Sequence, residues 1–104
     1  MDAWQVIAEP RRREILRLVW DGERSSGEIA DAFDVTFGAV SQHLAILRAA
    51  GFVEVRKAGN RRFYRANREV LRPFEAGLEA MWASSLERLA DAAEAEHRRE
   101  AGRS

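Results

Sequence analysis

The segment SSGEIADAFDVTFGAVSQHLAILRAAGFVEVRKAGNRRFYRAN, residues 25–67, decides the fold. Ser25 and Glu28 form the S-x-x-E pattern of a capping box, which predicts that a helix begins there. Thr36 is a favourable N-cap for a second helix, because its hydroxyl can accept a hydrogen bond from a first-turn backbone N–H. The two helices are therefore separated by a short turn at Asp34 and Val35.

The second of these helices has a single apolar stripe. Val40, Leu44 and Leu47 recur at helical spacing and are expected on one buried face. Gly51 suits the left-handed position just beyond the helix end. The positions expected to face outward are Phe37, Gly38, Ala39, Ser41, Gln42 and, next to a core leucine, His43.

Two strand-like runs follow, at residues 52–55 and 62–65, with Ala58-Gly59-Asn60 between them. Alternation predicts that Val53, Val55 and Phe63 face the core. Helix, turn, helix and hairpin in this order are typical of a winged helix-turn-helix. We therefore expect a mainly α protein with a small β-hairpin.

The flanking segments are predicted to be helical. Residues 4–20 form two helices, because a residue before proline avoids the α conformation and proline suits a first turn; the first ends near Ala8 and the second runs from Pro10 to Asp21-Gly22. From Arg68 onward we expect one long helix. Its apolar stripe consists of Leu71, Phe74, Leu78, Met81, Trp82, Leu86, Leu89 and Ala93. Part of this stripe should pack on the domain body; the rest, Trp82 included, would otherwise be an exposed patch, which indicates an interface.

The composition excludes several classes of protein. The chain has 104 residues, which fits a single domain over 1–104 with a polar tail at 98–104. It has no cysteine, so no disulfide framework or thiolate metal site is expected. No apolar run approaches membrane-spanning length and the N-terminus does not fit a signal peptide, so we expect a cytoplasmic protein without membrane association.

The charge is neutral overall but segregated. Residues 35–68 contain seven basic residues and one acid, a net charge of +6, which leaves −6 on the remainder. A positive face on a neutral molecule can steer it towards nucleic acid. The alternative is a solvated hairpin that happens to be basic.

The outward residues of the second helix suit a DNA major groove. Gln42 can donate to and accept from adenine, and Ser41 and Thr36 can bond phosphates or base edges. His43 could reach phosphate or guanine, or simply be a packed side chain. Phe37 could touch a thymine methyl or pack on the preceding helix, and the small Gly38 and Ala39 permit close approach. A merely solvated helix surface is the alternative.

The hairpin would contact the flanking DNA backbone or minor groove. The residues expected to do so are Arg56, Lys57, Asn60, Arg61, Arg62 and Arg65. Glu54 is the only acid near them in the sequence, so they cannot all be paired. Alternation allows only part of the set to face DNA at once.

The chain resembles the ArsR-type winged-helix transcriptional repressors. The resemblance rests on AEPRRREILRLV, GEIADAF and VTFGAVSQHLAILRAAGFVEVRKAGNRRFYRAN and spans about residues 4–67. It implies a homodimer on a pseudo-palindromic operator, joined through the first and last helices (1–8 and 69–97), and repression that an unknown inducer releases. The expected interface residues are Trp4, Leu78, Met81, Trp82, Leu86 and Leu89.

The family's metal-binding patterns are missing. GEIADAF contains no thiol, and Asp91 and His97 are six residues apart, which places them on different helix faces. The resemblance is therefore to the non-metal subgroup, and neither a metal nor a cofactor is expected.

Two other functions are alternatives to DNA binding. A winged-helix protein-interaction module would keep this fold without binding DNA. A small enzyme is disfavoured because the sequence shows no nucleophile–base–acid set and no glycine-rich phosphate loop. Ser41 and His43 would point in different directions on their helix, so no catalytic residues are expected.

Overall fold

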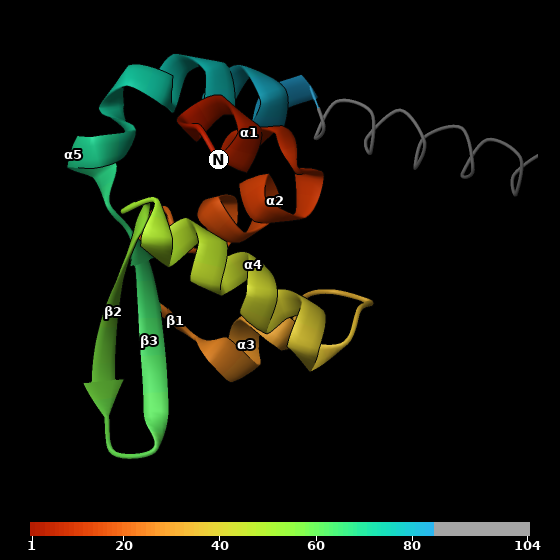
Figure 1. The fold of residues 1–104 in the computed structure, drawn as a ribbon, viewed down its shortest axis with the longest axis vertical. Coiled ribbons are helices and arrows are strands. Elements are labelled where there is room, and N and C mark those ends of the chain that lie inside the picture. The colour runs from red at the N-terminus through yellow and green to blue at the C-terminus, as the bar shows by residue number, and fades with distance from the viewer. Residues whose placement is uncertain (85–104) are drawn as a thin grey trace, which may run out of the picture. The chain divides into compact units, whose positions relative to one another are not determined.

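The computed structural model describes residues 1–84, and the chain divides into two compact units, residues 1–73 and residues 74–104. Figure 1 shows that the first unit contains the helices α1–α4 and the β-hairpin. The single domain over 1–104 stays a prediction. The predictions for Leu86, Leu89, Asp91, Ala93, His97 and the tail 98–104 lie outside the described residues.

The predicted break at Glu9-Pro10 is confirmed. Helix α1 spans Ala3–Ala8, and α2 spans Pro10–Leu18 with the Glu9 carboxylate accepting from Arg11 N at 3.0 Å. Helix α2 ends three residues before the expected Asp21. The carbonyl of Val19 instead accepts from Ala66 N at 3.0 Å, which ties the residue after α2 to the sheet.

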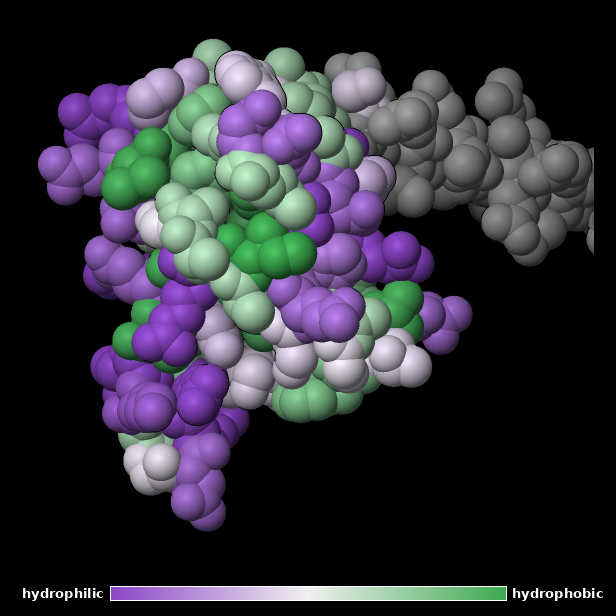
Figure 2. Space-filling view, in the orientation of Figure 1, coloured by the Kyte–Doolittle hydropathy of each residue, from purple (hydrophilic) through white to green (hydrophobic). Residues whose placement is uncertain are grey.

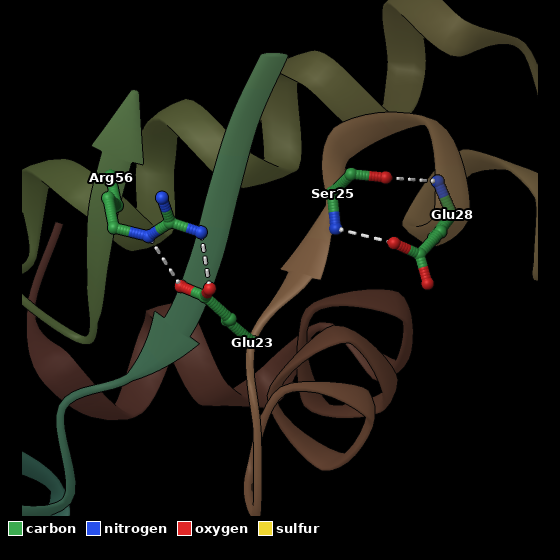
Figure 3. A network of polar contacts seen from close by, with 4 residues as sticks. All are labelled: Glu23, Ser25, Glu28 and Arg56. Atoms are coloured by element: carbon green, nitrogen blue, oxygen red, sulfur yellow. Dashed lines mark hydrogen bonds and ion pairs between the residues drawn. The ribbon is translucent and has the colours of Figure 1, made fainter. Parts of the chain in front are cut away.

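Both predicted caps of the helix-turn-helix are confirmed. Helix α3 spans Ser26–Asp31; Glu28 N donates to Ser25 Oγ at 3.1 Å, and Ser25 N donates to the Glu28 carboxylate at 3.2 Å (Figure 3). Helix α4 spans Phe37–Ala49 and is capped by Thr36, whose hydroxyl accepts from Ala39 N at 3.1 Å.

Helix α4 is held by the expected stripe. Val40, Leu44 and Leu47 are buried, and α4 contacts both α2 and α3. Gly51 has a φ of 78°, as expected for the residue that follows a helix end. The exposed residues of α4, among them Phe37, Ser41 and Gln42, are therefore available to a partner.

The hairpin is longer than predicted and belongs to a three-stranded antiparallel sheet. Strand β2 spans Val53–Ala58 and β3 spans Arg61–Ala66, so the tip is only Gly59-Asn60, with Gly59 at a φ of 61°. Strand β1, Arg24–Ser25, was not predicted and gives the order β1-β3-β2. It is two residues long and Ser25 also caps α3, so no strand pattern marked it.

The prediction that Phe63 faces the core is wrong. Val53 pairs with Ala66 and Val55 with Tyr64, so these residues share one face, on which Tyr64 is buried. Phe63 lies on the opposite face and is half-buried. Phe63 and Tyr64 are adjacent and both aromatic, so hydrophobicity alone could not show which of them faces the core.

The expected continuous helix from Arg68 is interrupted. Helix α5 spans Arg68–Leu71, the 3-10 turn η1 spans Arg72–Phe74, and residues 75–84 are helical. Pro73 lacks a backbone N–H and so cannot donate the next helical hydrogen bond, which accounts for the break. Within residues 1–84, no helix combines the length and apolar character that a bilayer span requires.

Candidate nucleic-acid interface

The first turns of α4 present the side chains expected to read DNA. Phe37 is 58% exposed, and Ser41 and Gln42 are exposed on the same helix. Thr36 and Gly38 are exposed as well, whereas Ala39 is half-buried. Thr36, Ser41 and Gln42 are polar and Gly38 and Ala39 are small, so this surface leaves room for an approach to base edges.

His43 has a different environment from these residues. It is half-buried, and its Nδ1 lies 3.4 Å from Arg12 Nη1 on α2. Burial lowers the pKa of His43 most, the nearby Arg12 and Arg11 lower it further, and Glu9 opposes them. His43 is therefore held neutral against α2, which fits a packing role, and a DNA contact by this residue stays a prediction.

Arg12 links α1 to this histidine and was missed in the sequence. Its side chain is buried, with Nε donating to Val6 O at 2.7 Å and Nη2 donating to Gln5 O at 3.1 Å. These carbonyl groups belong to the last turn of α1 and would otherwise have no hydrogen-bond partner within the helix. The only available signal was an arginine run directly after a helix break.

The basic side chains of the hairpin divide between its two faces. Lys57 pairs with Arg62 on the face that continues Val55 and Tyr64. Arg56, Arg61 and Arg65 lie on the opposite face, together with Phe63. Figure 2 shows hydrophilic side chains gathered over the hairpin. The prediction that the set divides between faces is confirmed.

The expectation that Glu54 is the only acid near the hairpin is wrong. Glu23, in the segment between α2 and β1, accepts from Arg56 Nη2 at 2.6 Å and from Arg56 Nε at 3.2 Å. Arg65 pairs with Glu54 at 3.5 Å. Glu23 and Arg56 are far apart in the sequence, so only the fold reveals this pair.

The two ion pairs leave the cations nearest the hairpin tip without a carboxylate partner. Among the described residues, no carboxylate forms a salt bridge with Lys57, Arg61 or Arg62. These side chains are exposed and flank Gly59-Asn60. The positive charge of the hairpin that no ion pair neutralises is therefore concentrated at its tip.

The Glu23–Arg56 pair also shifts the titration of both partners. The hydrogen bond and charge of Arg56 lower the pKa of Glu23, and Glu23 raises the pKa of Arg56. Both groups therefore stay charged at neutral pH, and the pair persists there.

The residues expected at a dimer interface differ in exposure. Trp4 is 58% exposed, whereas Leu78 is buried and Trp82 is 8% exposed. Met81 is half-buried. Their role at an interface stays a prediction.

No cluster of metal-binding side chains is found within residues 1–84: nowhere in this part do three His, Asp or Glu side chains converge as ligands.

The fold and the exposed face of α4 beside a basic hairpin define a winged helix-turn-helix DNA-binding regulator. Residues 9–55 match the family model described as bacterial regulatory protein, arsR family. The HTH-type transcriptional regulator Rv2034 of Mycobacterium tuberculosis is 37% identical over 81% of this chain and 78% of its own length. The chain belongs to the ArsR family of bacterial transcriptional regulators.

Further relatives agree in fold. The transcriptional repressor SdpR of Bacillus subtilis is 33% identical over 67% of this chain and 78% of its own length. A crystal structure of a possible transcriptional regulator for arsenical resistance, 37% identical, aligns with a TM-score of 0.68 over 86% of this chain and 94% of that chain. A homodimeric winged helix-turn-helix DNA-binding domain from Mycobacterium bovis, 33% identical, aligns with a TM-score of 0.67 over 75% of this chain and 73% of that chain. All of these are regulators rather than enzymes by name.

Proposed function

We propose that this chain is a homodimeric, cytoplasmic repressor that binds a pseudo-palindromic operator and is released by an inducer. The observation that carries the proposal is the exposed polar start of α4, together with the cations Lys57, Arg61 and Arg62 that no salt bridge pairs at the hairpin tip. Helix α4, here called the recognition helix, enters the major groove. The hairpin, here called the wing, contacts the flanking phosphates or minor groove.

The assignments to individual residues follow from their chemistry. Gln42 reads an adenine edge, Ser41 and Thr36 bond phosphates or bases, and Phe37 meets a thymine methyl. A homodimer is supported by the likeness to the homodimeric Mycobacterium bovis domain. Two-fold symmetry in the protein then requires a two-fold arrangement of half-sites in the DNA.

Repression is favoured over activation by the similarity to the Bacillus subtilis repressor. The transcriptional activator HlyU of Vibrio cholerae is also 40% identical, over 58% of this chain, so the sign of regulation needs its own measurement. Transcription in vitro from a promoter that contains the selected site should fall when the protein is added. A rise would contradict repression while leaving DNA binding intact.

Selection of bound sequences from random duplex DNA tests the binding proposal. The selected pool should converge on an inverted repeat whose half-site centres lie about one helical turn apart. A pool that stays random after repeated selection would contradict sequence-specific binding and would favour the protein-interaction alternative.

A further inference from the structure

The Glu23–Arg56 ion pair crosses the sheet. Glu23 immediately precedes β1, and Arg56 lies on β2, while β3 lies between these two strands. Figure 3 shows the two side chains meeting across β3, with Nε and Nη2 of Arg56 directed at the Glu23 carboxylate. The pair therefore connects the segment before β1 to the far strand of the wing.

Strand β1 links the wing to α3 by a short stretch of sheet. This strand pairs with β3 at only two positions, Arg24 with Tyr64 and Ser25 with Phe63. Ser25 is at the same time the N-cap of α3, which contacts the recognition helix. The wing also contacts the helices directly, through α4 with β2 and through α3 with β3. The ion pair adds a further connection, from the segment before β1 to the far strand of the wing.

The same pair organises a basic cluster around an aromatic ring. The Arg56 guanidinium lies 4.6 Å from the centroid of Phe63, and the Arg61 guanidinium lies 5.0 Å from it. Guanidinium groups over an aromatic face are attracted by the ring quadrupole. Glu23 holds the Arg56 side chain, and Arg56 pairs with Phe63 across the two strands. The Phe63 ring, on which the Arg61 guanidinium stacks, therefore has a defined position.

We propose that Glu23 is a positioning residue for DNA binding: through Arg56 and Phe63 it sets the wing and holds Arg61 in its DNA-binding place. This inference rests on the proposed function. It predicts a change in DNA affinity opposite in sign to the change expected from net charge alone. Removing an acid from a DNA-binding surface should strengthen binding by charge alone, whereas loss of the positioning contact should weaken it.

Glu54 provides a matched control. It is also exposed and also paired with an arginine, Arg65, but this pair joins neighbouring strands within the wing and does not reach the segment before β1. Glu23→Gln and Glu54→Gln make the same change of charge and size. Only Glu23→Gln removes the ion pair that crosses the sheet.

The test measures the affinity of wild type and both variants for the duplex selected by the wild-type protein. Glu23→Gln should weaken binding about fivefold, as suits a bidentate but exposed pair. Glu54→Gln should bind as tightly as wild type or slightly more tightly. Equal affinities for the two variants, or tighter binding by Glu23→Gln, would overturn the proposal.

A double-variant cycle tests whether Glu23 acts through Arg61. In an Arg61→Ala background, Glu23→Gln should cost less than about twofold, because the group that it positions is gone. An undiminished fivefold loss would overturn that route. If the wild-type protein itself selects no duplex, the proposed function fails; if wild type binds and the two glutamine variants match, only the positioning role fails.

Discussion

The guanidinium of Arg12 lies 3.4 Å from Nδ1 of His43, so one arginine joins the end of α1 to the recognition helix. The histidine is half-buried at this contact. A second positive charge there would face Arg12 and lose its hydration. The neutral form of His43 is therefore part of the folded state.

Acidification should destabilise the protein through His43. The folded pKa lies below the ordinary 6.5, so the unfolded chain binds this proton more readily. The free energy of unfolding should be unaffected by His43 above pH 6.5 and should fall as the pH decreases from there to the folded pKa. His43→Gln should remove that fall, as urea unfolding at a series of pH values would show.

The carboxylates respond in a separate pH range. The pKa values of Glu9 and Glu28 are lowered from 4.5, chiefly by backbone hydrogen bonds from Arg11 and Ser25, so their contribution is lost only as the pH falls below 4.5. Wild type and His43→Gln should therefore lose stability alike in that lower range. Identical stability profiles between pH 6.5 and 4.5 would contradict the role assigned to His43.

The wing should act as a phosphate clamp. Replacing Arg61 and Arg62 with alanine should flatten the dependence of log affinity on log salt by up to about 2, because each phosphate contact releases counterions. Arg61 and Arg62 are successive residues of β3 and point to opposite faces, so a change near 1 would mean that one face contacts DNA. Affinity for selected and random duplexes should fall together.

Arg17→Ala is the control for the wing variant, because Arg17 is exposed on α2 and pairs with Glu14 there. It should leave the salt dependence unchanged, and all variants should remain folded because the altered side chains are exposed. An unchanged salt dependence for the wing variant would exclude a backbone clamp.

Local signals in the sequence predicted much of the fold. The caps at Ser25 and Thr36 and the break at Pro10 need only residues a few positions away, and each is confirmed. The same holds for the buried stripe of α4, whose spacing is set by the helical repeat.

Features that depend on distant pairing were not predictable in this way. The Glu23–Arg56 contact joins residues 33 positions apart. Strand β1 exists only because β3 is there to pair with it. Whether Phe63 or Tyr64 faces the core is decided by register, and the sequence offered two aromatic side chains of similar character.

The protein should be a homodimer in solution. Trp4 is exposed on α1, and burial between two copies would remove this apolar surface from water. Sedimentation at micromolar concentration should show a dimer, and Trp4→Glu should shift it towards monomer. Phe37→Glu, an equally exposed aromatic outside the expected interface, should leave the dimer intact. A wild-type monomer would contradict this prediction.

DNA binding should not require a metal. The chain has no cysteine, and the family's facing ligand pairs are missing from its sequence. Affinity for the selected duplex should be the same with added zinc and with a chelator. A difference of about tenfold or more would reveal a metal site.

The central claim is that the recognition helix reads bases, and Gln42→Ala tests it most directly. Gln42 is exposed on α4, away from the buried stripe, so the substitution should leave the fold unchanged. The measurement compares the affinity of wild type and variant for the selected duplex and for a random duplex of equal length. Binding to the selected duplex should weaken by about 1–3 kcal/mol per half-site, with little change on the random duplex. Equal losses on both duplexes would contradict base reading by Gln42.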